Sequence, residues 1–237
     1  MGNWREDALA RLTSPHKSTD TLFGELARLT RDLGFEFCSF GIRAAPANST
    51  QTESWATNYP QTWQQRYFAN SYLSVDPILA QAWRTGLPVT WGTSHIGGQH
   101  EFWEDANAHG VRHGWTVATW GRSNTNGLFS ASRTADSLSR LELEEVEPRL
   151  LWLAHTAHAA MSAMMPDVPH AIAHELTPRE CEVLKWTAAG KTAHQIATLL
   201  KISERTVNFH VTSIVEKLDS VNKTQASVKA ALLGLLR

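Results

Sequence analysis

Cysteine is scarce in this 237-residue sequence. The two cysteines, Cys38 and Cys181, lie far apart and form no paired-cysteine motif, which disfavours a disulfide framework or a zinc knuckle. Such sparing use of cysteine fits a reducing compartment. The first residues also lack a basic stretch followed by an apolar core, so nothing in them directs secretion. We therefore expect the protein to be cytoplasmic.

Long hydrophobic runs are missing as well. The most apolar long stretch, residues 150–165, contains His155 and His158 and is shorter than the roughly 20 residues that a bilayer-spanning helix needs. The sequence has no HExxH, GxSxG or Walker motif, and the two histidines of this stretch lack a third metal ligand. We therefore expect no membrane partner, no metal, no cofactor and no catalytic activity.

Neither sign of charge dominates, because the formal net charge is −1. From His174 onward, however, there are nine basic and six acidic side chains, which gives this segment a net charge of +3. The preceding residues carry 13 basic and 17 acidic side chains, a net charge of −4. The C-terminal segment is therefore the part of the chain suited to bind phosphate groups.

A chain of this length, with 42% hydrophobic residues, is long enough for two globular domains. Pro166 and Pro169 directly follow a long helical pattern, which is typical of a helix end and the start of a linker. We predict an N-terminal domain of residues 1–165, a linker of residues 166–174 and a C-terminal domain of residues 175–237.

The C-terminal domain contains clear helix start and stop signals. Residues 177–180 form a capping box with proline at the first helical position, and Gly190 is suited to end that helix. Residues 192–195 repeat the capping box, and Ser203 is suited to cap a third helix. Apolar residues recur in that third helix at near-helical spacing: Val207, Phe209, Val211, Ile214, Val215 and Leu218. With a fourth helix at about residues 224–236, the pattern predicts an all-α domain of four helices that contains a helix-turn-helix.

The N-terminal domain alternates between helical and strand-like patterns. Helices are predicted at residues 19–33, 60–70, 75–86, 99–109 and 139–165. Strands are predicted at residues 35–43, 52–57, 115–120 and 127–133. This alternation predicts an α/β domain, an α/β/α sandwich with a mainly antiparallel sheet.

Three stretches of the C-terminal domain carry a resemblance to a known family: Leu176 to Leu184, Gly190 to Thr192 and Thr206 to Val211. They resemble the LuxR-type DNA-binding domain, whose recurrent Glu, Leu and Gly fall on Glu180, Leu184 and Gly190. The resemblance covers about Leu176 to Leu236 and implies binding to double-stranded DNA, with the third helix, residues 204–217, in the major groove. A small helical bundle without a DNA partner is the alternative explanation.

Outward-facing residues of the third helix are candidates for base recognition. Arg205, Asn208 and Thr212 lie off its apolar stripe, three or four residues apart. Asparagine can bind adenine with two hydrogen bonds, and a threonine methyl can contact a thymine methyl. The residues better placed to hold phosphates are Lys191, Thr192, Thr206, Lys217 and Lys223. Each of these alone is equally typical of a solvated helix face.

A second resemblance rests on the spacing of six residues in the N-terminal domain: Tyr59, Trp63, Tyr67, Asp76, Pro77 and Trp91. This spacing, together with Phe102-Trp103-Glu104 and His113-Gly114, resembles the acyl-homoserine-lactone-binding domain of quorum-sensing receptors. The resemblance implies that Trp63 donates to the lactone carbonyl and that Asp76 accepts from the amide N–H. It also implies that Tyr59 and Ser130 bind acyl carbonyl oxygen. The predicted ligand-binding residues are Tyr59, Trp63, Tyr67, Asp76, Trp91 and Ser130.

Packing in a core is the alternative explanation for the aromatic residues, and for each of them alone it is the more typical one. Asp76 favours a ligand, because a carboxylate among apolar neighbours is costly to bury without a partner. The length of the ligand's acyl chain would depend on pocket residues such as Ile78, Trp115, Val117 and Leu128.

These features are typical of a LuxR-family quorum-sensing transcriptional regulator. We expect it to bind an N-acyl-homoserine lactone and, as a homodimer, an inverted-repeat promoter site. Two alternatives stay open: a LuxR-type regulator that senses a different small molecule, and a lactone-processing enzyme with a DNA-binding tail.

Overall fold

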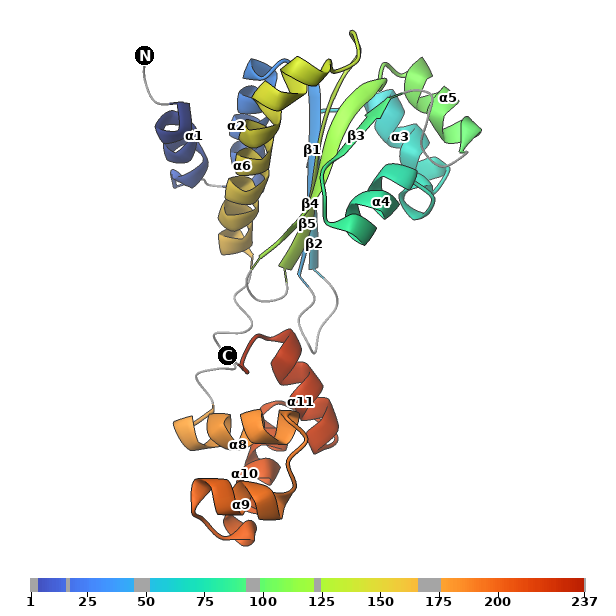
Figure 1. Ribbon diagram of the computed structural model, residues 1–237. Coiled ribbons are helices and arrows are strands. Elements are labelled where there is room, and N and C mark those ends of the chain that lie inside the picture. The colour runs from blue at the N-terminus through green and yellow to red at the C-terminus, as the bar shows by residue number, and fades with distance from the viewer. Residues whose placement is uncertain are drawn as a thin grey trace. The chain divides into compact units, whose positions relative to one another are not determined.

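A computed structural model describes residues 4–15, 18–44, 52–92, 99–121, 125–165 and 176–236 of the chain. These residues form two compact units, the first made mainly of residues 4–164 and the second mainly of residues 176–236 (Figure 1). The predicted linker, residues 166–174, lies outside the described residues.

The first unit combines helices with a five-stranded sheet. Its described helices are α1 (Trp4–Thr13), α2 (Thr19–Asp32), α3 (Gln61–Ala69), the 3-10 turn η1 (Tyr72–Ser74), α4 (Pro77–Thr85), α5 (His100–Ala108) and α6 (Arg140–Met164). Its strands are β1 (Phe37–Ala44), β2 (Thr52–Thr57), β3 (Val89–Gly92), β4 (His113–Trp120) and β5 (Thr125–Arg133). The sequence analysis predicts all of these except α1, β3 and the short turn η1.

The strands are arranged in the order β2-β1-β5-β4-β3. The pairs β3–β4 and β4–β5 are antiparallel, with Thr116 of β4 opposite Ser130 of β5. Because side chains alternate between the two faces of a strand, Ser130 and Ser132 lie on the same face. This register decides which side chains reach the cavity described below.

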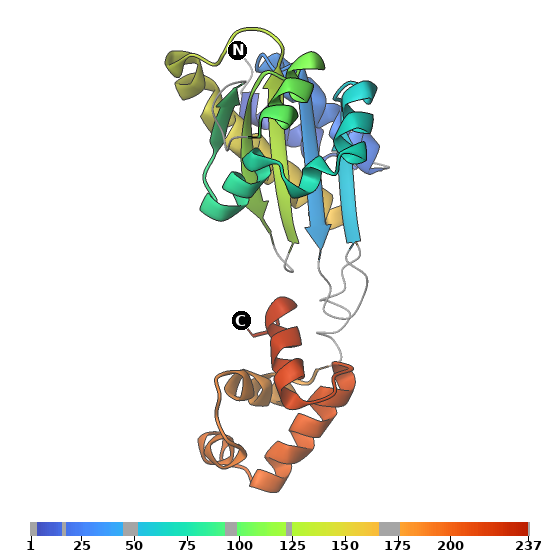
Figure 2. The same cartoon turned by 90° about the vertical axis from the view of Figure 1, so that its right-hand side faces the viewer.

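Helices cover both faces of the sheet. Figures 1 and 2 show α1, α2 and α6 on one face and α3, α4 and α5 on the other. On the first face, Phe40 of β1 packs against Phe129 of β5 and edge-on against His158 of α6. On the second face, a separate buried cluster includes Trp63 and Phe102. The unit is therefore the predicted α/β/α sandwich with a mainly antiparallel sheet.

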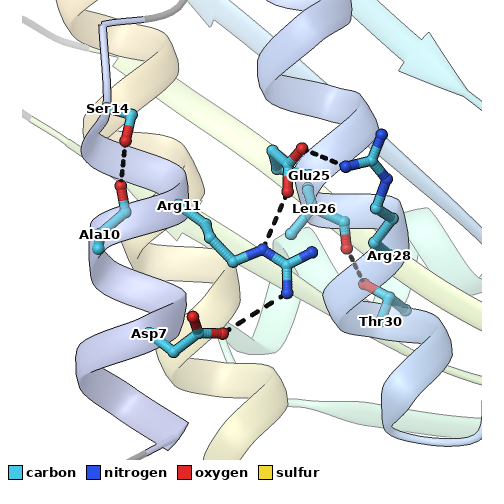
Figure 3. A network of polar contacts seen from close by, with 8 residues as sticks. All are labelled: Asp7, Ala10, Arg11, Ser14, Glu25, Leu26, Arg28 and Thr30. Carbon is cyan, nitrogen blue, oxygen red and sulfur yellow. Dashed lines mark hydrogen bonds and ion pairs between the residues drawn. The ribbon is translucent and has the colours of Figure 1, made fainter.

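Helix α1 is held by ionic contacts, which Figure 3 shows, and by an aromatic contact. The Arg11 guanidinium donates to Glu25 of α2 over 2.9 Å and lies 3.5 Å from Asp7 on its own helix. Trp4 packs edge-on against Trp152 of α6, with ring centroids 5.6 Å apart. These contacts join α1 to α2 and to α6. A short helix that depends on such distant partners has only a weak signal in its own sequence.

The second unit consists, in its described residues, of α8 (Pro178–Ala188), α9 (Ala193–Leu200), α10 (Glu204–Lys217) and α11 (Lys223–Leu232). The predicted capping boxes are confirmed at Thr177 with Glu180 and at Thr192 with Gln195, and Ser203 accepts a hydrogen bond from the Thr206 N–H over 3.1 Å. The shared core contains Leu176, Val183, Leu184, Ile196, Val207, Ile214, Leu218 and Ala226. The all-α prediction is thus confirmed.

Gly114 provides a test of this packing, because the Trp91 ring lies directly over it. A Cβ at Gly114 would overlap that ring and approach the Ala131 carbonyl oxygen to 2.6 Å. We expect Gly114→Ala to lower the free energy of unfolding by about 1–3 kcal/mol, as overpacking does, in a denaturant titration. The matched control is Gly24→Ala in α2, where a Cβ meets nothing within 4 Å and alanine is the better helix former. Equal stability of the two variants would contradict the packing described here.

Candidate functional site

A cavity of about 60 Å³ lies in the first unit, between the sheet and helices α3, α4 and α5. Its walls include all six residues that the sequence predicts to bind a ligand: Tyr59, Trp63, Tyr67, Asp76, Trp91 and Ser130. They come from five places along the chain: the segment after β2, helix α3, the start of α4, and strands β3 and β5. The fold therefore brings the predicted site together.

Asp76 is both a helix cap and a wall of the cavity. Its Oδ1 accepts hydrogen bonds from the N–H groups of Ile78 (2.8 Å) and Leu79 (3.3 Å), which cap α4. Its Oδ2 accepts from the Tyr67 hydroxyl over 2.9 Å. Asp76 is 6% exposed, so the carboxylate is buried with three partners from the protein itself. The inference that its burial requires a ligand is therefore wrong, because the cap supplies partners.

The ionisation of Asp76 is finely balanced. Burial raises the pKa of its carboxyl group to about 6, although the hydrogen bonds from Tyr67, Leu79 and Ile78 oppose this change. At neutral pH the group is therefore mostly ionised and able to accept a further hydrogen bond.

Two of the tryptophans that line the cavity, Trp63 and Trp91, differ in how their indole N–H groups are used. Trp91 Nε1 donates to the Thr116 hydroxyl over 2.9 Å, and Thr116 in turn is hydrogen-bonded to Ser130. Trp63, packed edge-on against Tyr67 and Phe102, makes no hydrogen bond through Nε1 within the described part of the chain. Trp63 therefore keeps a donor for a bound molecule, whereas the donor of Trp91 is already used.

Tyr59 contributes a hydroxyl from the segment that follows β2. Its ring stacks on Phe37 at 5.7 Å between centroids. Burial raises the pKa of the phenol, and the neighbouring Ser132 hydroxyl lowers it in part. The phenol is thus neutral at physiological pH and able to donate a hydrogen bond.

Sequence reasoning misses several residues of the cavity wall: Ser39, Trp55, Thr57, Gln64, Phe68, Leu79, Phe102 and Val111. Gln64 Nε2 donates to the Tyr59 carbonyl oxygen over 2.8 Å and so fixes the segment that carries Tyr59. Of the residues expected to limit the acyl chain, Ile78 lines the cavity. Trp115 faces α6 instead, where its Nε1 donates to Glu147 over 2.8 Å. One signal that was available is Ser39, a hydroxyl inside the otherwise apolar run of residues 37–40.

Helix α10 of the second unit presents one face to solvent. Arg205, Asn208 and Thr212, the predicted base-reading residues, are all exposed on it. Phe209, which the periodicity places in the core, is 69% exposed beside them, so that prediction is wrong. The buried positions Val207 and Ile214 lie on the opposite side. An exposed aromatic ring within this face is a further candidate for contact with a partner.

The residues predicted to hold phosphates differ in what they do within the unit. Lys191 and Lys223 are exposed. Thr192 caps α9, and Thr206 shares a hydrogen bond with the Ser203 hydroxyl over 2.8 Å. Lys217 forms an ion pair with Glu180 inside the unit, so it has a structural role besides the predicted contact with phosphate.

Lys217 and Glu180 form an ion pair that joins α10 to α8. Lys217 Nζ lies 3.0 Å and 2.8 Å from the two carboxylate oxygens of Glu180, and the Ser213 hydroxyl donates to the same carboxylate over 2.6 Å. Glu180 is only 4% exposed. Burial alone would raise the pKa of Glu180, but hydrogen bonds from Lys217, Ser213 and Thr177 outweigh it and hold that pKa at about 2. We infer that Lys217 holds α10 in place.

The chain matches two protein families. Residues 18–161 match the autoinducer binding domain, and residues 174–230 match the bacterial regulatory proteins of the luxR family. The transcriptional activator protein AnoR of Acinetobacter nosocomialis is 34% identical over 239 residues, which cover 100% of both proteins. The transcriptional activator protein SolR of Ralstonia nicotianae is 38% identical over 216 residues, or 91% of this chain and 92% of that relative.

Solved structures with the same fold include SdiA of Escherichia coli. One crystal structure of SdiA matches with a TM-score of 0.77 and 28% identity, covering 99% of this chain and 98% of that one. SdiA in complex with octanoyl-rac-glycerol matches with a TM-score of 0.76 and 29% identity, covering 99% and 96%. In the described ranges no helix is long and apolar enough to cross a membrane, and no cluster of His, Cys, Asp and Glu is arranged to hold a metal ion.

The ion pair between Glu180 and Lys217 leads to a stability prediction. We expect Lys217→Met to lower the free energy of unfolding of the second unit by about 1–3 kcal/mol, because it leaves a buried carboxylate without its charged donor. Hydrogen exchange of the α8 and α10 amides measures this unit separately from the first. Lys223→Met, which removes an exposed lysine, is the matched control.

The loss should also depend on pH. The folded pKa of Glu180 is below its unfolded value, so its contribution is fully present above about pH 4.5 and is lost as the pH falls toward about 2. The original protein and the Lys217→Met variant should therefore become more alike in their free energy of unfolding as the solution is acidified. A Lys217→Met variant as stable as the Lys223→Met control at pH 7 would contradict the assigned role.

Proposed function

Because this chain belongs to the LuxR family of quorum-sensing transcriptional regulators, with an autoinducer-binding domain and a DNA-binding domain, we propose that it binds an N-acyl-homoserine lactone in the cavity of its first unit. We further propose that it binds an inverted-repeat promoter site as a homodimer. The proposal keeps the domain boundaries 1–165 and 175–237, joined by a linker of residues 166–174. A promoter-binding protein works where the bacterial chromosome lies, so we propose a cytoplasmic location.

The observation that carries the ligand proposal is the pairing of a free donor with an available acceptor in one cavity. Trp63 Nε1 offers an N–H to a lactone carbonyl, and Asp76 offers a carboxylate to an amide N–H. Tyr59 and Ser130 offer hydroxyls to the acyl carbonyl. An acyl-homoserine lactone presents these three polar groups together with an apolar chain, and aromatic walls suit that chain.

The size of the cavity has a consequence for binding. A volume of about 60 Å³ holds only a few water molecules. A lactone therefore has to displace side chains from the positions described here and take their place in the core. Binding of this kind stabilises the folded protein in proportion to ligand concentration.

A second candidate ligand class is an acylglycerol, and the reason is the SdiA complex with octanoyl-rac-glycerol. Such a molecule has an acyl carbonyl but no amide N–H. Its free hydroxyls can donate to the Asp76 carboxylate in place of the amide. An acylglycerol can therefore satisfy the same acceptor in this cavity, and a ligand panel should contain both classes.

The exposed face of α10 supports the DNA proposal. Asn208 is suited to read adenine. The exposed ring of Phe209 and the exposed methyl group of Thr212 are suited to contact thymine methyl groups. The segment from His174 onward carries a net charge of only +3, so one copy neutralises few phosphates. Two joined copies combine their contacts and read half-sites about one helical turn apart.

Asp76 gives the first functional prediction. A lactone at one hundred times its dissociation constant should stabilise the protein by about 2.7 kcal/mol, seen as a higher melting temperature. Asp76→Asn should remove most of this gain, because the amide loses the charge-assisted hydrogen bond. Asparagine is an equally good N-cap, so α4 should still form. The control is Asp32→Asn, an exposed carboxylate of α2; a melting temperature that no lactone changes would sink the ligand proposal.

Asn208 gives the second functional prediction. On a site selected from random DNA, Asn208→Ala should weaken the binding free energy by about 1–3 kcal/mol, because the Asn208 amide reads a base edge. The variant should also tolerate more bases at one position of the site. Lys191→Ala should weaken binding to selected and random DNA alike, because an exposed lysine holds phosphate. Competition gel shifts with both kinds of DNA distinguish the two outcomes. Equal losses on both for Asn208→Ala would assign this residue to the DNA backbone.

A further inference from the structure

Lys229 is a buried lysine of the second unit that takes no part in the proposed DNA contacts. It lies on α11 and is 3% exposed. Lysine is almost never buried to this degree unless its ammonium group finds acceptors inside the protein. Lys229 Nζ donates to the backbone carbonyl oxygens of Leu218 and, over 2.8 Å, of Asp219. The Asp219 carboxylate is 3.9 Å away but 92% exposed, so solvent screens it and the two carbonyl groups are the main partners.

These two carbonyl groups belong to the C-terminal end of α10, the helix proposed to enter the major groove. Leu218 caps α10, and Asp219 follows it. The last carbonyl groups of a helix form the negative end of its dipole, where a cation is favourable. Ala226 and Ala230 of α11 are buried in the shared core, so the stem of Lys229 starts from a fixed place. Lys229 therefore joins α11 to the end of α10.

The end of α10 also has a cap of its own, which does not involve Lys229. The Asp219 N–H donates to the Glu216 carbonyl oxygen over 2.9 Å. The Ser220 N–H donates to the Val215 carbonyl oxygen, also over 2.9 Å. These two bonds, with Asp219 in the left-handed region at a φ of 44°, make a Schellman motif. Because this motif ends the helix, the bonds from Lys229 add a connection to a second helix.

The place of this connection matters for reading DNA. Two buried polar contacts hold the C-terminal end of α10, that of Lys217 with Glu180 of α8 and that of Lys229 with Leu218. Asn208 lies ten residues before Leu218, about 15 Å along the helix axis. A tilt of about 5° at the held end would move Asn208 by about 1.3 Å. Binding groups have to be held within about 0.5 Å, so base reading is sensitive to the anchor.

We propose that Lys229 is a positioning residue for DNA recognition: it sets the tilt of α10 through the carbonyl groups of Leu218 and Asp219. The inference rests on the proposed DNA function. A buried ammonium group contacts no DNA phosphate, so its loss should leave the contacts of the exposed lysines in place. The protein needs Lys229 to distinguish its own site from other DNA, and it can bind DNA of any sequence without this residue.

The first test compares two kinds of DNA with the full-length protein. One is a site selected from random DNA by the original protein, and the other is random DNA. Lys229→Met keeps an apolar stem and removes the ammonium group. It should bind the selected site about tenfold more weakly, the loss expected for one misplaced base contact, and should bind random DNA with an affinity changed by less than about twofold. Lys223→Met is the control, because it removes the same charge from the exposed start of α11 and should weaken binding to both DNAs alike.

A double-mutant cycle separates positioning from a loss of folded protein. Lys229→Met combined with Asn208→Ala should lose much less affinity for the selected site than the product of the two single losses, because no amide is left to misplace. A fall in the folded fraction would instead multiply with the loss from Asn208→Ala.

A stabilising change provides a second separation. Glycine adopts a φ of 44° without strain, so Asp219→Gly should strengthen the end of α10. Added to Lys229→Met, it should restore the protection of the α10 amides in hydrogen exchange. It should not restore the preference for the selected site, because the ammonium group is still missing.

Lys229→Gln keeps the test decisive should the methionine variant not fold. Its amide still donates but is shorter than the lysine side chain, so about threefold of the preference for the selected site should be lost. An unchanged preference in Lys229→Gln would overturn the role of Lys229. Equal losses of Lys229→Met on both DNAs, no loss at all, single losses that multiply in the cycle, or a preference restored by Asp219→Gly would overturn it as well. Failure of the original protein to enrich any site from random DNA would overturn the DNA proposal itself, and the role of Lys229 with it.

Discussion

The carboxylate of Asp76 connects local folding with ligand recognition. Its Oδ1 starts α4, and its Oδ2 binds the Tyr67 hydroxyl and so holds α3 against α4. A carboxylate offers about four acceptor positions, of which the protein occupies three. One remains for a donor on the ligand, next to the free N–H of Trp63. A ligand that binds there contacts the same carboxylate that caps α4 and holds α3 against it. Ligand binding is therefore coupled to the positions of these two helices and of the aromatic side chains on α3.

The parts of the fold that sequence predicts best are those fixed by local chemistry. The capping residues Thr177, Thr192 and Ser203 define helix starts through bonds only three residues long, and α10 has the predicted bounds. The same chemistry was present at Asp76 and Pro77, a cap followed by proline at the first helical position. This local cap, and not a ligand, accounts for the burial of the Asp76 carboxylate.

What sequence misses depends on tertiary register. Phe209 and Trp115 have apolar side chains at periodic positions, but periodicity does not say which face of a helix or strand meets the core. Ser39 is a wall of the cavity because β1 lies between β2 and β5, which no local pattern reveals. The spacing from Tyr59 to Trp91 did locate the cavity. The five ligand-binding residues predicted from that spacing line one space, together with Ser130.

Helix α10 separates the residues that support it from the residues that it presents. Lys217, Ser213, Val207 and Ile214 hold it through an ion pair, a hydrogen bond and apolar packing, whereas Arg205, Asn208 and Phe209 project into solvent. Substitutions on the projecting face leave these supports intact. Over evolutionary time, such a helix can acquire new target promoters one surface residue at a time, while selection for a folded scaffold acts on a different set of positions.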